Sequence, residues 1–493
     1  TENFYMSYSQ NQKRSENALF ESTPIIRAVF SLALPAVISA LAVTLYGFAD
    51  AYFLGRGKNP DMLAAVSVCI PLSAAATGIS ALFGTGGAGV IAASLGKNNI
   101  RRARSAFIFC AAGTTFLSAA FSAGVFLFSD KILPLIGAKK ETAEYASSYL
   151  FRTVVLGSVP VSLTGCLSQL IRALGKPGVS SFGTMLSALL NTALDAVFVL
   201  FIYGKGREIY AVGDAFLISA AASCAFFIIY MLFSKNALKN EAVKKDGTKN
   251  DGGHIQKSAF SETFRIGFPS AAAIILATFS NIISNFFISS CGSAAVAGFG
   301  TAKRLSSLAF NVNTAFSQSI LPLISYCFAS KNRERMKKAA ALNFSAALVL
   351  SLFYMAVSLI YAKNIAVLFI GNGKTAEYCA KFLKLLSPAF PMCVASFCIC
   401  SFLQGCGKPK SALAVTALRK GTLDIILMYL AFVFVNIYLV ALATTVTEAV
   451  SATAACIILI RFLKGFQNQM YSSRDSGRKD KSRASRQSKV QGK

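Results

Sequence analysis

Long apolar segments recur along the whole chain, and they constrain its fold more than any other feature. Each one can cross a bilayer as a helix, because about 20 apolar residues span the hydrocarbon core. In lipid, only helices and closed barrels satisfy all of their backbone hydrogen bonds. We therefore predict an all-α polytopic membrane protein with twelve transmembrane helices, at residues 26–53, 62–93, 105–128, 146–171, 178–203, 212–233, 263–289, 294–328, 339–361, 378–404, 411–435 and 437–461.

The amino-acid composition agrees with this fold class and excludes several functions. Hydrophobic residues make up 54% of the chain and charged residues only 14%. The net charge of +28 is typical of nucleic-acid binders, but the Lys and Arg residues lie between the apolar segments, as in cytoplasmic loops. Most of the twelve cysteines lie inside apolar segments without metal-ligand spacing, and His254 is the only histidine. We expect no nucleic-acid partner, no metal site, no enzymatic activity and no cofactor other than a coupling ion.

The basic residues also predict the orientation. The segments after the second, sixth and eighth predicted helices are rich in Lys and Arg, and the alternate segments are poorer. By the positive-inside rule, both termini then lie in the cytoplasm of a multi-pass protein in the plasma (inner) membrane. The predicted cytoplasmic parts are an N-terminal tail (1–24), a linker (236–261) and a basic, disordered C-terminal tail (466–493).

An internal repeat divides the chain near its middle. The motif LALP at Leu32–Pro35 recurs as IGFP at Ile266–Pro269, and RALGKP at Arg172–Pro177 recurs as QGCGKP at Gln404–Pro409. The offset between the two copies is nearly constant. We predict two homologous six-helix bundles (25–235 and 262–465), related by a pseudo-two-fold axis along the membrane normal. Two such bundles enclose a central cleft, and rocking them exposes it to each side in turn.

Acidic residues inside the predicted helices indicate a functional site. An Asp at the centre of a membrane helix costs roughly 2.5 to 3.5 kcal/mol on insertion scales, so it usually faces water or an ion path. Asp50 lies near the end of an apolar segment that is bent by Pro35. Asn191 and Asp195 lie one turn apart on a second apolar segment. By depth, Asp50, Asp195 and Ser219 all fall in the outer half of the bilayer.

These residues predict a carboxylate-lined pocket in the first bundle. Removal from water and a neighbouring negative charge both favour the protonated form of a carboxyl group. Oxygen ligands would equally suit a hard cation such as sodium, so H+ and Na+ both remain open. In the repeat, Asp50 aligns near Ser284 or Asn285 and Asp195 with Leu427, which places the carboxylate site in the first half alone.

The chain resembles the multidrug and toxic compound extrusion (MATE) transporters of the MOP flippase superfamily. The resemblance is carried by LALP, LYGFADAYFLG, SLGKNNIRRA, RALGKP with QGCGKP, and NTALD. It implies export of amphipathic, cationic compounds in exchange for H+ or Na+. The implied cation site falls on Asp50, Asn191 and Asp195, with Ser219 where Thr is common. The implied hinge is Pro35, and Tyr46 would face the substrate cavity.

The second bundle departs from part of the family pattern. Its helices 263–289 and 378–404 lack the acidic residues that some branches carry there, which argues against a second cation site. We predict that Arg304 and Glu448 contact the substrate, with structural pairing or snorkelling as the alternative for Arg304. We expect a monomer.

Two other functions would each need a feature that this sequence lacks. A flippase for lipid-linked oligosaccharide or polysaccharide could use the same pair of bundles, but it would need a broad basic cleft, and the predicted helices are poor in Lys and Arg. An intramembrane aspartyl protease would need a Tyr-Asp motif, whereas Ala49 precedes Asp50.

Overall fold

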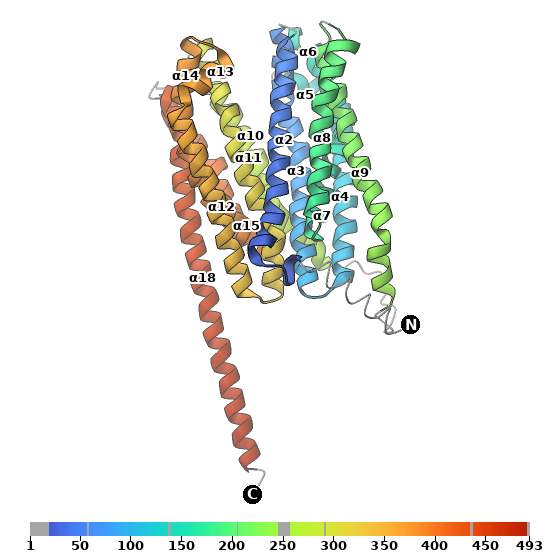
Figure 1. Ribbon diagram of the computed structural model, residues 1–493, viewed down its shortest axis with the longest axis vertical. Coiled ribbons are helices and arrows are strands. Elements are labelled where there is room, and N and C mark those ends of the chain that lie inside the picture. Colours follow the sequence, from blue (N-terminus) through green and yellow to red (C-terminus); the bar gives the residue numbers. More distant parts are fainter. Residues whose placement is uncertain are drawn as a thin grey trace.

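The protein is a bundle of long helices in a computed structural model that describes residues 19–56, 59–136, 140–204, 206–244, 257–289, 292–433 and 437–490 (Figure 1). The helices of the first half are α2 (Ile25–Arg56), α3 (Pro60–Gly96), α4 (Ile100–Leu127), α5 (Ser129–Leu135), α6 (Lys140–Leu150), η1 (Phe151–Leu156), α7 (Ser158–Ala173), α8 (Pro177–Val197), η2 (Phe198–Ile202) and α9 (Glu208–Lys244). Those of the second half are α10 (Lys257–Ser289), α11 (Ser293–Ala329), α12 (Arg333–Ile360), α13 (Ala362–Ile370), α14 (Lys374–Leu386), α15 (Ala389–Gly405), α16 (Pro409–Ala417), η3 (Leu418–Thr422), α17 (Leu423–Val433) and α18 (Ile437–Val490).

The predicted all-helical membrane fold is confirmed at the level of the individual helices. Within the described residues, eight helices are long and apolar enough to cross a membrane, and two bent pairs raise this number to ten. The other two predicted spans are also helical, as α11 and as α16 with η3 and α17. Both contain consecutive basic residues, Lys303–Arg304 and Arg419–Lys420, which lower their hydropathy. Twelve membrane crossings therefore stay a prediction. The short helices α5 and α13 were not predicted.

Equivalent positions of the two halves have similar local structure. The side chains of Asn99 and Asn332 cap α4 and α12 by accepting hydrogen bonds from the backbone N–H three residues later. The residues before these caps, Asn98 and Lys331, have positive φ angles of 56° and 61°. The bends are equally matched, at 44° between η1 and α7 and 45° between α14 and α15. These similarities support the predicted repeat, while the pseudo-two-fold axis itself stays a prediction.

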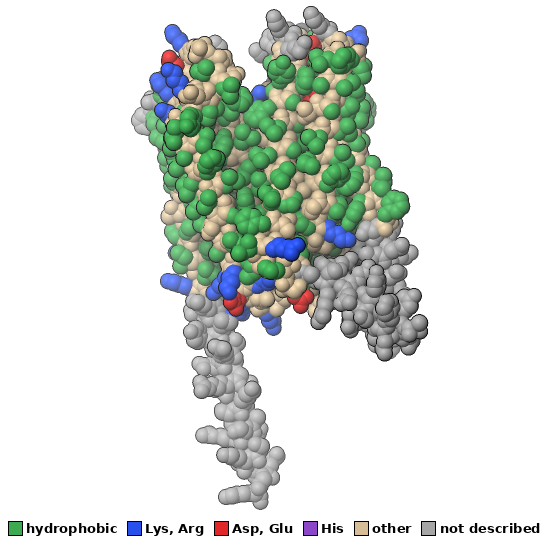
Figure 2. Space-filling model, viewed as in Figure 1, with side chains coloured by type: hydrophobic (Ala, Val, Ile, Leu, Met, Phe, Trp, Pro, Cys, Tyr) green, Lys and Arg blue, Asp and Glu red, His purple; other side chains and the backbone are tan. Residues whose placement is uncertain are grey.

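The two halves contact each other through α3 and α10 and through α2 and α11. Glycines allow the first pair to approach closely: a Cβ atom on Gly267 would lie 1.8 Å from the carbonyl oxygen of Leu82, and one on Gly86 would lie 2.2 Å from that of Thr263. In the second pair, Asn311 Nδ2 donates a 2.9 Å hydrogen bond to Thr44 Oγ1. At the end of the molecule away from the C-terminus, Figure 2 shows a notch between the two halves.

Two segments predicted to lie between or beyond the membrane helices are more helical than expected. In the linker 236–261, α9 continues to Lys244 and α10 begins at Lys257; residues 245–256 lie outside the described residues. The C-terminal tail was predicted to be disordered, but α18 continues through it to Val490 (Figure 1). No proline interrupts this polar stretch, so nothing in its local sequence ends the helix.

The end of the predicted N-terminal tail is packed against the bundle. Phe20 is fully buried and stacks on Tyr326 with ring centroids 5.5 Å apart. Arg335 donates hydrogen bonds to the carbonyl oxygens of Leu19 and Thr23. Residues 1–18 of this tail lie outside the described residues.

Candidate functional site

Three of the four predicted cation-site residues lie together between α2 and α8. Asp50 comes from the outer part of α2, and Asn191 and Asp195 lie on one face of α8. The carboxyl groups of Asp50 and Asp195 are within hydrogen-bonding range of each other. The Asn191 amide donates to Asp50 Oδ1 at 3.1 Å and accepts from the backbone N–H of Phe216 on α9 at 3.3 Å. Three helices therefore meet at one pair of carboxyl groups.

The environment of this pair requires a positive partner. Asp195 is fully buried, Asn191 is 98% buried, and Asp50 is half-buried. The Oδ1 atom of Asp195 is buried without a hydrogen-bond partner, and among the described residues neither carboxylate pairs with a Lys or Arg. Two adjacent carboxylates in such a place are stable only when a proton or a cation neutralises part of their charge. The oxygen atoms present fit one proton or one hard monovalent cation.

Local structure around the pair is also unusual. The α-helical pattern of α8 ends at Val197 and changes to the π-helix η2 at Phe198, three residues after Asp195. η2 forms the last turn of this helix, and π-helical turns are rare in proteins. The sequence alone did not indicate this change of helix type.

The structure places the other first-half candidates around the carboxyl pair. Tyr46 is half-buried, one turn before Asp50 on α2, and lies within electrostatic range of Asp50 and Asp195. Tyr149 on α6 also lies within this range, although the sequence analysis missed it. Ser219 is buried on α9, and its hydroxyl donates a 2.9 Å hydrogen bond to the carbonyl of Phe216. Ser219 therefore contacts the same backbone segment as Asn191, and its role as a cation ligand stays a prediction.

Pro35 lies inside a continuous helix. It has no N–H to donate within α2, yet the helix runs without interruption from Ile25 to Arg56. Ser39 donates to the carbonyl oxygens of Pro35 at 2.9 Å and of Ser181 on α8 at 3.0 Å, so this part of α2 is tied to α8. A change of bend at Pro35 stays a prediction.

A known protein family matches this chain over both of its halves. The MatE family model matches residues 35–197 and again residues 269–430, repeating the offset found within the sequence. The chain belongs to the MATE family. The first of the two matches contains all three residues that meet between α2 and α8.

Individual relatives agree over most of the chain. The multidrug export protein MepA of Staphylococcus aureus is 28% identical over 442 residues, covering 89% of this chain and 94% of MepA. MepA of Staphylococcus haemolyticus is 28% identical over 446 residues, covering 90% of this chain and 94% of that protein. Among solved structures, an outward-facing multidrug resistance MATE transporter of the MOP superfamily aligns with a TM-score of 0.80 at 19% identity, over 90% of this chain and 97% of that one.

The second half of this MATE protein contains a buried charged cluster, whose two acidic residues lie on α17 and α18, outside the helices 263–289 and 378–404. Asp424 and Glu448 are both fully buried. Lys420 lies 3.5 Å from Asp424 Oδ2 and 3.4 Å from Glu448 Oε1, and Arg419 lies 3.4 Å from the same glutamate oxygen. Ser280 on α10 donates to Asp424. Asp424 was missed because the sequence comparison tested only the positions aligned with Asp50 and Asp195.

The two predicted substrate contacts in the second half differ in accessibility. Glu448 is enclosed by its ion pairs, so no substrate can reach it in this conformation without displacing them. Arg304 is exposed on α11 and has no ion pair among the described residues. The structure therefore leaves Arg304 available for substrate contact, while the same role for Glu448 stays a prediction that needs a rearrangement.

A second polar network occupies the first half near the outer helix ends. Arg152 Nε donates to Asp214 Oδ1 at 2.7 Å, its Nη1 donates to Ser148 Oγ at 2.6 Å, and Tyr203 also donates to Asp214. Asp214 is an acidic residue near the beginning of the mostly apolar helix α9. The Asp214 carboxylate is paired with the Arg152 guanidinium, and this ion pair joins η1 to α9.

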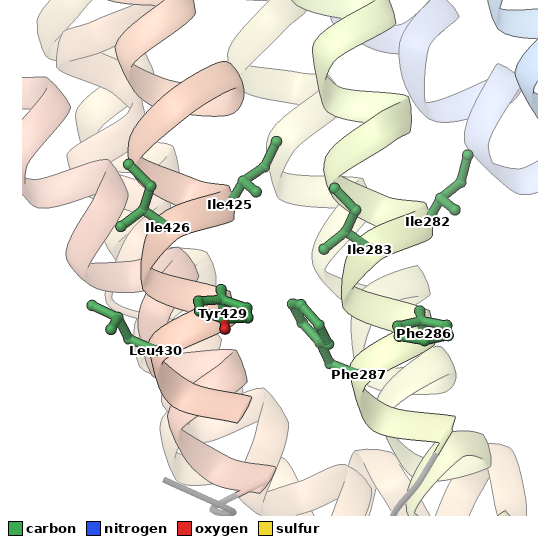
Figure 3. A pocket seen from close by; sticks show the side chains of 8 residues that line it. All are labelled: Ile282, Ile283, Phe286, Phe287, Ile425, Ile426, Tyr429 and Leu430. Atoms are coloured by element: carbon green, nitrogen blue, oxygen red, sulfur yellow. The ribbon is translucent and has the colours of Figure 1, made fainter. Parts of the chain in front are cut away.

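An apolar groove of about 520 Å³ opens between α10 and α17 (Figure 3). Figure 3 shows Ile425, Tyr429 and Phe287 on the sides of the two helices that face each other, whereas Ile426 and Leu430 lie on the far side of α17 and Ile282 on the far side of α10. The groove is lined by Ile282, Ile283, Phe286, Phe287, Ile425, Ile426, Tyr429 and Leu430. The lining carries no charge and contains none of the predicted site residues.

Proposed function

We propose that this MATE protein is a secondary antiporter that exports amphipathic, cationic small molecules in exchange for H+ or Na+. The observation that carries the proposal is the buried pair Asp50 and Asp195, with Asn191 bonded to it and one carboxylate oxygen left without a partner. The relatives named as multidrug export proteins support the transported class.

The orientation of the protein in the membrane follows from the distribution of charge. The basic turn between α3 and α4 packs against the basic turn between α11 and α12, since a Cβ atom on Gly96 would lie 3.3 Å from Ser330 N. The positive-inside rule assigns this end, with both termini, to the cytoplasm. The notch in Figure 2 is at the opposite end and so faces outward.

The proposed cycle couples the carboxyl pair to the two halves of the chain, which act as two bundles. A cation entering from outside binds Asp50 and Asp195 and neutralises them. Because α2 carries Asp50 and also contacts α11 through Thr44 and Asn311, a change in the bend of α2 at Pro35 alters the contact between the bundles. The cleft then loses affinity for the substrate, which leaves outward, and alternating access returns the empty site.

The test uses the purified protein in proteoliposomes with a pH gradient or a sodium gradient imposed separately. Efflux of a panel of fluorescent organic cations is expected under at least one gradient. Asp50→Asn and Asp195→Asn should each abolish gradient-driven efflux while the protein still inserts, because an amide cannot exchange a proton or balance a cation's charge. Asp130→Asn is the matched control, since Asp130 is exposed on α5. Unimpaired transport by both site variants would refute the coupling mechanism.

A further inference from the structure

The charged cluster of the second half has an excess of positive charge. It contains three cations, Lys303, Arg419 and Lys420, and two carboxylates, Asp424 and Glu448. Lys420 bridges both carboxylates, and Arg419 pairs with one of them. The ammonium group of Lys303 donates hydrogen bonds to two neutral atoms, Asn281 Oδ1 and Ser284 Oγ, each at 2.8 Å, and lies 5.1 Å from the centroid of the Phe299 ring. One positive charge in the cluster therefore has no counter-ion among the described residues.

A hydrogen-bonded path makes Lys303 part of this cluster. Ser284, which accepts from Lys303, donates to the carbonyl of Ser280 at 2.9 Å, and Ser280 donates to Asp424. Asp424 is already engaged by Ser280 and Lys420. An uncompensated cation in a membrane segment is energetically costly, and such residues persist where water or an anionic ligand reaches them.

The surroundings of Lys303 indicate that the cleft reaches it. Asn281 and Asn285 lie one turn apart on α10 and are both exposed, and exposed amides in a membrane segment face water rather than lipid. On α11, Arg304 lies two turns from Asn311, on the same face of the helix. Because Asn311 donates a hydrogen bond to Thr44 on α2, Arg304 is on the side of α11 that faces the first half. Arg304 therefore adds positive potential to the wall that carries Lys303.

We propose that Lys303, together with the Asn281 amide and the positive potential of Arg304, binds the carboxylate of transported compounds. When a compound of the transported class carries an anionic group, that group lies on the second half while the cationic part faces the acidic first half. This inference depends on the proposed export function and names one more part of its substrate site. The chain's own carboxylates cannot take this role, because both of the nearby ones are bonded to other groups.

The test compares a dye with its ester. The ethyl ester of rhodamine B is the transported reporter in proteoliposomes, and rhodamine B, which carries a free carboxylate, is the competitor. Loss of one charge-assisted hydrogen bond should raise the inhibition constant of rhodamine B about tenfold in Lys303→Gln. The KM for the ester should stay unchanged in the same variant. Lys303→Arg should keep the wild-type inhibition constant, and Lys381→Gln, at an exposed lysine of α14, is the matched control.

Each alternative outcome has a defined meaning. Equal inhibition constants for Lys303→Gln and the wild type would overturn the anion subsite. An equal weakening for ester and acid would also overturn it, because Lys303 would then act on the second half as a whole. If the wild type transports neither the ester nor any other cation of the panel, the export function is refuted. Fluorescence anisotropy of rhodamine B on the purified wild type and Lys303→Gln then decides the subsite without transport.

Discussion

The contact between α3 and α10 offers a sharp test of how the two halves are held together. In Gly267→Ala, the new Cβ atom would lie 1.8 Å from the carbonyl oxygen of Leu82 and 2.7 Å from its carbonyl carbon. A carbon–oxygen contact needs about 3.3 Å, so the two helices must separate by about 1.5 Å. Rotation of a side chain cannot relieve this clash, because the atoms concerned belong to the backbone.

The expected magnitude follows from two opposing effects. Overpacking costs about 1 to 3 kcal/mol, and a backbone clash belongs at the upper end of this range. Replacing a helical Gly with Ala returns up to about 1 kcal/mol. We therefore expect Gly267→Ala to lose about 2 kcal/mol. Gly300→Ala is the matched control, because a Cβ atom there meets no atom within 4 Å; it should be neutral or stabilising.

The assay combines thermal melting of the purified variants with hydrogen–deuterium exchange. Gly267→Ala should melt at a lower temperature than Gly300→Ala, and exchange should rise in α3 and α10 around Gly86 and Thr263, where the same pair of helices is in contact. If Gly267→Ala were as stable as the control and its exchange unchanged, the close approach of α3 and α10 would not hold the halves together.

Two further predictions concern other parts of the chain. A double-mutant cycle with Arg152→Met and Asp214→Asn should give a coupling energy of about 1 kcal/mol, because both side chains remain about a quarter exposed, at 24% and 23%; additive effects in thermal or chemical unfolding would contradict the ion pair. The chain contains no tryptophan, so Phe286→Trp in the apolar groove and Phe353→Trp on the exposed face of α12 each introduce a single fluorophore. If the groove holds an acyl chain, brominated lipid added to detergent-solubilised protein should quench the tryptophan of Phe286→Trp at a lower lipid concentration than that of Phe353→Trp. Equal quenching of the two tryptophans would contradict binding of an acyl chain in the groove.

The helices themselves were predictable because membrane insertion depends on local apolar length. Ten of the twelve predicted spans agree with the structure to within six residues at each end, including the bent pair that forms α6, η1 and α7, while α9 and α18 continue well past their predicted ends. The spacing of Asn191 and Asp195 also placed both on one helical face. Disorder was predicted for the tail beyond Gly465 from its polar composition, but the structure has a helix there. A polar composition predicts exposure to solvent, and exposure does not exclude a helix.

The sequence by itself determined the fold class, the repeat and the identity of the first-half acidic residues, since these depend on residue type and on spacing along one helix. Only the tertiary structure decided which polar groups meet. Whether Asn191 reaches Asp50, and whether Lys420 reaches both Asp424 and Glu448, depends on how far neighbouring helices are rotated about their axes. The packing of the whole bundle sets that rotation, and no local pattern in the chain encodes it.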